Sequence, residues 1–266
     1  GMGYTVQPTG ATSMRQSLLL AVLVGFFLAS VHPVWAIVLR VSETEFLAGS
    51  GQITFSEFAI NTNNPVYTPA DYGGGAGSPT VNFGGYFLGQ SLSLTPNADC
   101  PGAAATGCVV GNPTSSLALD PTSPNTFITD DSVNPTSPVL SGNPTFNGPI
   151  AVLFNQDQVG VGFDAGFFDE AQSTGITAFA RDGSLLGTVT NNDLGIEFLG
   201  LVDSNGVANI AGVFLDLVGS EPAGFAIDNL RFGRSGQVVV PVPEPGTLAL
   251  LSGGLVALAA LRRRRE

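Results

Sequence analysis

The sequence predicts an all-β protein whose body is an antiparallel β-sandwich or jelly roll, and three observations lead to this class. About nine short apolar runs, many with apolar residues at alternate positions, follow one another between residues 53 and 232. Glycine, proline, asparagine or aspartate bounds these runs, and no stretch of the body keeps a helical period for three turns. Closely spaced short strands of this kind are typical of sandwiches and jelly rolls.

The first element in the chain is a predicted export signal. Residues 1–13 form a polar leader that a signal peptide does not need, and Met14 is the better start. Residues 14–36 combine one basic side chain, an apolar core over 18–29 and small or neutral residues before position 37, which is the pattern of a secretory signal-peptide helix. We expect signal peptidase to cut before Ile37, with a retained membrane anchor as the alternative.

The body is expected over residues 37–235 and contains the predicted strands. The strongest hairpin signal is Asp182-Gly183, whose residues favour the positive φ values of a two-residue turn. The strands are expected at residues 53–60, 81–88, 150–154, 159–163, 176–181, 185–190, 196–201, 209–218 and 225–232.

Residues 95–149 interrupt this series of strands. Half of the chain's 18 prolines gather there with serine, threonine and asparagine, which predicts a long insertion that runs over the sheets, either as a binding loop or without a function of its own. Cys100 and Cys108 lie near one end of it, and in an oxidising compartment they are expected to form a disulfide. A redox or metal pair is the alternative, but two thiolates without a nearby histidine make a poor zinc site.

Composition excludes several functions. The chain has a net charge of -12 and contains no lysine, so no basic face is available for a nucleic acid. Between residues 37 and 244, 20 acidic side chains stand against four arginines, which gives about -16 for the body. The single histidine, His32, lies in the signal peptide. The exported body therefore has no catalytic triad and no imidazole base or metal ligand, and we expect no enzyme.

Carboxylates are the remaining candidates for chemistry. An acidic, histidine-free body suits calcium, which binds oxygen ligands, and Ca²⁺ is the one cofactor that we consider. Asp228 lies between apolar neighbours in a predicted strand and needs a partner such as Arg231 or calcium. The alternative is that these acids are solvated or cap turns. The candidate calcium ligands are Glu57, Asp164, Asp169, Asp228 and Asn229.

The C-terminal region contains three blocks with separate physical meanings. A linker over 236–246 holds a Val-Pro-Glu-Pro motif, and the prolines of its Pro-Glu-Pro segment fix φ and remove backbone donors, so that segment should be extended, unpaired and accessible. Residues 247–266 comprise an apolar run, expected to form a short transmembrane helix, and a basic tail that should stop in the cytoplasm. The motif is Val242, Pro243, Glu244 and Pro245, and the tail contains Arg262, Arg263, Arg264 and Arg265.

These blocks, in this order, resemble the PEP-CTERM sorting signal of exopolysaccharide-producing bacteria. The resemblance covers about the last 25 residues of the sequence and implies an exosortase, a membrane-embedded protease that recognises the Pro-Glu-Pro segment and removes the helix and tail. It implies a protein that is anchored in the inner membrane before processing and then reaches the cell surface or the extracellular, polysaccharide-rich biofilm matrix. An ordinary C-terminal membrane anchor explains the helix and the arginines, but not the motif placed directly before them.

The second half of the body resembles the jelly-roll domain common in PEP-CTERM proteins, which is similar to galactose-binding-like sandwiches. The resemblance rests on the strand rhythm from residue 159 and on the closing strand at 225–232. Three functions follow as hypotheses. We prefer a non-enzymatic surface or matrix protein. A calcium-dependent carbohydrate-binding module would need exposed aromatic residues, and a glycoside hydrolase would need two facing carboxylates. The aromatic candidates are Tyr67, Tyr72, Tyr86 and Phe167.

Overall fold

The computed structural model describes residues 1, 3, 38–132, 138–222 and 225–241. The predicted signal-peptide helix and the predicted C-terminal transmembrane helix both lie outside these residues. The chain divides into two compact units, Gly1–Trp35 and Ala36–Glu266, and the folded body belongs to the second. Within the described ranges, no helix is long and apolar enough to cross a membrane.

The body contains a seven-stranded sheet in which all strand pairs are antiparallel. Strand β15 (Ala226–Gly233), near its centre, also pairs with β2 (Gly51–Ile53). The order of the other strands is β1 (Val38–Val41), β13 (Gly195–Asp203), β10 (Gly160–Phe168), β15 (Ala226–Gly233), β8 (Val139–Gly142) and β7 (Thr126–Thr129).

A second sheet of six strands is antiparallel as well. Its order is β12 (Leu185–Thr190), β11 (Thr174–Phe179), β14 (Ile210–Leu217), β9 (Ala151–Gln158), β4 (Val81–Gly84) and β3 (Val66–Tyr67). A separate pair joins β5 (Gln90–Leu92) to β6 (Val109–Gly111).

The main core lies between the two large sheets. Phe163 and Phe232 from the first sheet and Phe154 and Leu215 from the second are each 0–1 % exposed and belong to one cluster. The two sheets therefore form an antiparallel β-sandwich, as the sequence predicts. The jelly-roll connectivity stays a prediction.

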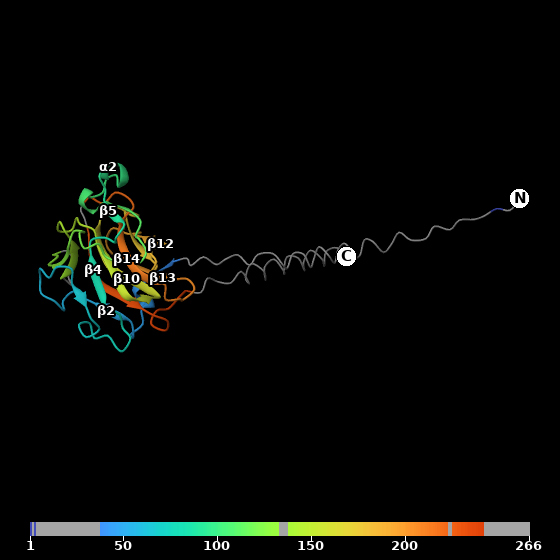
Figure 1. Ribbon diagram of the computed structural model, residues 1–266, viewed down its shortest axis with the longest axis horizontal. Coiled ribbons are helices and arrows are strands. Elements are labelled where there is room, and N and C mark those ends of the chain that lie inside the picture. Colours follow the sequence, from blue (N-terminus) through green and yellow to red (C-terminus); the bar gives the residue numbers. More distant parts are fainter. Residues whose placement is uncertain (2, 4–37, 133–137, 223–224, 242–266) are drawn as a thin grey trace. The chain divides into compact units, whose positions relative to one another are not determined.

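Helical structure in the described body is limited to single turns. These are η1 (Glu43–Glu45), α2 (Pro96–Asp99) and η2 (Ala105–Gly107). Figure 1 shows α2 next to β5 at one end of the body, with β2 at the opposite side of the view.

Most predicted strands are present, but the strand predicted at 53–60 is wrong beyond its first residue. β2 ends at Ile53. Thr54 then donates hydrogen bonds from its backbone N and from Oγ1 to Glu57 Oε1, at 2.9 and 2.8 Å. This side-chain capping closes a turn, and Phe55 takes a positive φ of 57°. The alternating apolar residues here pack onto the core from a turn and do not form a strand.

The Asp182-Gly183 hairpin is confirmed, with a different turn. Ala180 N donates to Ser184 O and Gly183 N to Ala180 O, each at 2.9 Å. Of the residues in this loop, only Gly183 has a positive φ (84°). The loop therefore has three residues, Arg181 to Gly183, with glycine in the left-handed position.

The predicted insertion at 95–149 contributes directly to the main sheet. β7 and β8 lie within it, and β8 pairs with β15 (Ala226 with Ser141, Ile227 with Leu140). Other parts of it follow the prediction and cover the outer face of the second sheet, where Leu117 packs with Phe214 and Phe179. The high proline content hid two short strands because prolines flank them and do not interrupt them.

One end of the sandwich gathers the first and last parts of the body. Val38, at the start of β1, pairs with Asp203 at the end of β13, and Gly160, at the start of β10, pairs with Gly233 at the end of β15. Gly160 also pairs with Val202 on β13. The start of β1 and the end of β15 therefore lie at the same end of the sheet, with β13 and β10 between them.

Candidate functional site

Three of the five predicted calcium ligands come together on neighbouring strands. Asp164 on β10 pairs with Asp228 on β15, beside an irregularity in the register. Asn229 takes a positive φ of 48° there, which is typical of a β-bulge that redirects side chains. Asn229 Nδ2 donates to Asp164 Oδ2 at 2.8 Å and, more weakly, to Asp228 Oδ2 at 3.4 Å. The bulge thus joins the two carboxylates through one amide.

The electrostatics of this group follow from burial. Asp228 is 1 % exposed, and its Oδ1 accepts a hydrogen bond from Asn229 N at 2.7 Å. Burial raises the pKa of Asp164, the Asn229 hydrogen bond opposes that rise, and nearby Glu43 adds to it. Arg231, a predicted partner of Asp228, instead binds the Glu43 carboxylate. A calcium ion between the carboxylates would require Asn229 to present Oδ1 in place of Nδ2.

The other two predicted ligands lie elsewhere. Glu57 caps its own turn through Thr54, and its Oε2 is buried near the hydroxyl of Tyr67, with no hydrogen-bond partner of normal geometry for either atom. Burial raises the pKa of Tyr67, and Glu57 raises it further. Asp169 follows β10, and its backbone N donates to Glu221 Oε2 at 3.1 Å. No group of three His, Cys, Asp or Glu residues within the described body could hold a metal ion.

Glu221 is a site residue that the sequence interpretation missed. It is 0 % exposed, and its Oε2 accepts hydrogen bonds from Ser173 Oγ at 2.8 Å and from Asp169 N. Burial raises its pKa to about 7, against the opposing effect of these hydrogen bonds, and nearby Asp169 raises it further. The sequence around Glu221 reads Gly-Ser-Glu-Pro, which suggests an exposed turn and carries no signal of a buried acid.

The aromatic candidates do not form a common surface. Tyr67 is 0 % and Tyr86 8 % exposed. Tyr72 packs edge-on against Phe232, with ring centroids 5.3 Å apart. Phe167 alone of the four candidates is well exposed, at 50 %. Tyr67 and Tyr86 are therefore buried packing residues, and Tyr72 is half-buried against the core, so the three tyrosines do not form an exposed platform for a sugar ring.

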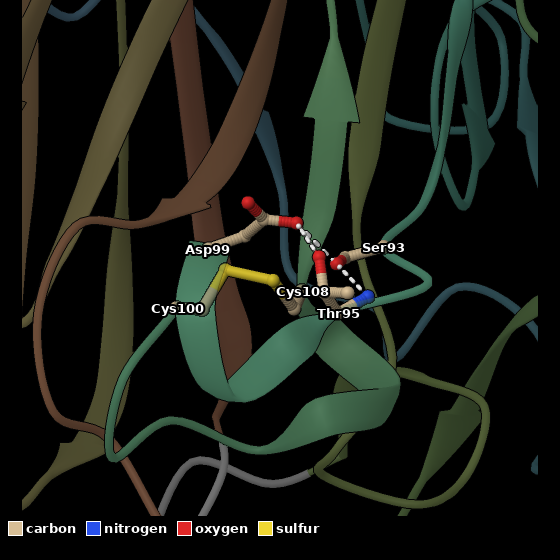
Figure 2. Close-up of a disulfide and its surroundings, with 5 residues drawn as sticks. All are labelled: Ser93, Thr95, Asp99, Cys100 and Cys108. Atoms are coloured by element: carbon tan, nitrogen blue, oxygen red, sulfur yellow. Dashed lines mark hydrogen bonds between the residues drawn. A yellow bond between two sulfur atoms is a disulfide. The ribbon is translucent and has the colours of Figure 1, made fainter.

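Cys100 and Cys108 form a disulfide next to the β5–β6 pair. Figure 2 shows the Asp99 carboxylate pointing from α2 toward Ser93 and Thr95, and Asp99 Oδ2 accepts from the hydroxyl groups of both. Cys108 is fully buried, and both sulfurs join the main core. The disulfide thus fastens this loop to the sandwich.

The segment Gln237–Val240, near the end of the described residues, is held against the beginning of the body. Phe46 and Val238 form an antiparallel bridge. Leu47 N donates to Gln237 O at 2.9 Å, and Val239 N donates to Glu45 O at 2.8 Å. Val238 is 6 % exposed, whereas Pro241, three residues later, is exposed. The packed body therefore ends at Val240.

Directly after this point, a family model described as the PEP-CTERM protein-sorting motif matches residues 241–265. The chain carries a PEP-CTERM sorting motif. The match spans the predicted Val242–Pro245 motif and the Arg262–Arg265 tail. A comparison of the chain with curated proteins finds no match.

The PEP-CTERM motif decides the destination of the chain more than any side-chain cluster in the body does. It marks an exported protein that is sorted at the membrane through its C-terminal region, with an exosortase as the processing partner. The motif residues Val242, Pro243, Glu244 and Pro245 and the four arginines lie outside the described residues. Their identification rests on sequence, because the three blocks are contiguous there.

Proposed function

We propose that this chain is a non-enzymatic protein of the cell surface or extracellular matrix, cleaved by an exosortase at the PEP motif. One observation carries the proposal: the match to the sorting motif begins at residue 241, directly after a β-sandwich that ends at Val240. After signal peptidase and exosortase have acted, the sandwich is the part that is released to the surface or to a polysaccharide matrix.

The chemistry of the described body supports a non-enzymatic role. Two pairs of acids lie close together, Asp164 with Asp228 and Asp169 with Glu221. A glycoside hydrolase needs two carboxylates that both reach the substrate, and Glu221 is 0 % exposed. Asp228 is 1 % exposed, and Asn229 bonds to both carboxylates. A substrate would have to displace the amide and open the bulge. The carbohydrate-binding alternative would depend on Phe167 without the three tyrosines.

Processing is tested by following the full chain, with an epitope tag inside the body, in cells with and without an exosortase. Loss of about 20 residues should lower the mass by about 2 kDa only where the enzyme is present. Glu244→Gln should block this step. Glu266→Gln is the matched control, because it removes the same charge outside the motif and should leave processing unchanged.

Two results would contradict the proposal. The first is equal processing of Glu244→Gln and the wild type in the presence of exosortase, which would mean that the motif is not read. The second is a mature wild-type chain that retains residues 247–266 at the cell surface. Incubation of the purified body with glycans, with and without calcium, tests the polysaccharide partner separately, and Phe167→Ala should abolish any binding that depends on ring stacking.

A further inference from the structure

We propose that Gln237–Val240 is a latch that must open before the sorting motif can be processed, so that the stability of the latch sets the processing rate. This inference rests on the proposed exosortase function and adds a regulatory step to it. The latch is a segment that joins Glu45–Leu47 through one isolated antiparallel bridge, and it follows β15 after a turn in which Gln237 N donates to Arg234 O.

The hydrogen bonds of the latch use the backbone that a protease would need. The Leu47 N to Gln237 O and Val239 N to Glu45 O bonds flank the Phe46–Val238 pair. The side chain of Gln237 adds two more, donating from Nε2 to Gly49 O at 2.7 Å and accepting at Oε1 from Arg234 N at 2.9 Å. Enzymes that read extended peptides pair with these same backbone groups.

A dedicated pocket receives the latch. Val238 packs with Val41, Phe46 and Val202 in a cluster separate from the main core. Two glycines leave the space that it fills: a Cβ atom on Gly233 would lie 2.6 Å from Val238 Cγ2, and one on Gly160 would lie 3.0 Å from Val238 Cγ1. A side chain at either glycine would displace the valine. The pocket thus fixes Val238 at the end of the sandwich where β1 begins.

When the latch is closed, few residues separate the folded body from the Pro-Glu-Pro segment that an enzyme would bind. Only Pro241 and Val242 separate Val240 from Pro243. Four residue steps from Val240 to Glu244 span at most about 14 Å, and release of the latch adds four residues, or about another 14 Å. An enzyme embedded in the membrane must enclose the motif on both sides. With the latch closed, the folded body occupies the side toward the N-terminus.

The first test weakens the latch and compares processing rates in exosortase-containing cells. When opening and closing are fast, proteolysis follows the population of the open form. Val238→Ala removes buried methyl groups from the pocket and should raise the processing rate by about tenfold. The matched control is Val152→Ala, at 1 % exposure in the main core, which should leave the rate unchanged.

The second test locks the latch. Phe46 and Val238 form a non-hydrogen-bonded antiparallel pair, in which Cα atoms lie about 4.5 Å apart and a disulfide fits. The oxidised Phe46→Cys, Val238→Cys variant should be processed at least about tenfold more slowly than the wild type. Phe46→Ser, Val238→Ser loses the same packing without a cross-link and should be processed faster than the wild type.

The outcomes separate this inference from the function on which it rests. If the wild type is processed and the locked, serine and Val238→Ala variants all match its rate, the latch proposal is overturned and the exosortase function stands. If the wild type is not processed when the enzyme is supplied, the function itself fails. A locked variant that is slow beside a fast serine variant supports the latch, because both have lost the same side chains.

Discussion

At the residue scale, the described body contains acids with different roles that the sequence does not distinguish. Glu57 and Asp71 each cap a turn: Thr54 donates to the first and Thr68 to the second, from both backbone N and Oγ1. Both fit the spacing Thr-x-x-Asp/Glu, which is a readable capping signal. Glu221, in contrast, is buried by a loop whose position depends on the whole fold. Burial raises the pKa of Glu221, whereas hydrogen bonding from Thr68 lowers the pKa of Asp71.

Glu221 should make the body less stable as pH rises from about 4.5 to about 7. Its pKa is raised from 4.5 to about 7 in the folded body, so the folded state binds more protons than the unfolded state in this window. The free energy of unfolding should fall there by on the order of 3 kcal/mol. Glu221→Gln should flatten this dependence, as measured by urea unfolding at several pH values.

A matched control is Glu45→Gln. Hydrogen bonding from Ser42 lowers the pKa of Glu45, so its contribution is present above its unfolded pKa of about 4.5 and is lost only below it. It should not alter the slope between pH 4.5 and 7. An identical slope in the wild type and Glu221→Gln would show that Glu221 does not titrate in this window.

At the scale of elements, the β5–β6 pair and the disulfide form one unit fastened to the sandwich. Ser93 N donates to Cys108 O at 2.9 Å and extends the ladder toward the disulfide. Ala104 N donates to Glu221 O at 3.0 Å, and Ser220 Oγ donates to Gly102 O at 3.2 Å. The loop closed by the disulfide therefore supports the loop that buries Glu221.

Removal of the disulfide should destabilise the body by about 2–3 kcal/mol. The variant to use is Cys100→Ala, Cys108→Ala, because serine at these positions would bury two hydroxyl groups in the core. Urea unfolding measures the loss of stability. Hydrogen exchange should increase first over residues 93–107 and then near Glu221. Treatment of the wild type with a reductant should give a similar change. An unchanged unfolding midpoint in the double variant would mean that core packing alone holds the loop.

At the scale of the whole molecule, the most unusual property of the sandwich is its large negative net charge. About 20 acidic side chains and four arginines fall between residues 37 and 244. In the described body, three ion pairs use three of these arginines: Arg40 with Glu197, Arg181 with Asp157, and Arg231 with Glu43. Most of the acidic charge is therefore not neutralised by arginine and opposes the compact state.

Salt should consequently stabilise the isolated body. Raising NaCl from about 10 mM to about 300 mM shortens the screening length to a few ångströms and should raise Tm by about 2–4 °C. Neutralising two exposed acids with Asp130→Asn and Asp193→Asn should reduce this dependence. A lower Tm at high salt would mean that the ion pairs outweigh the repulsion.

Calcium binding is tested by replacing NaCl with CaCl₂ at equal ionic strength. An additional rise in Tm that is lost in Asn229→Ala would identify a calcium site at the bulge.

The sequence by itself determined the features that depend only on residues close together in the chain. Apolar alternation predicted most of the strands, Asp182-Gly183 predicted the hairpin, and the adjacent motif, apolar run and arginines predicted the sorting signal. Each of these signals lies within one short stretch, so no distant contact is needed to read it.

Only the tertiary structure decided which distant segments meet. It placed β8 beside β15 and β7 beside β8, joined Asp164 to Asp228 through Asn229, buried Glu221 and paired Phe46 with Val238. The physical reason is that strand pairing and burial depend on contacts between residues far apart in the chain. The same proline-rich or acidic stretch is a loop or a core element according to what packs against it.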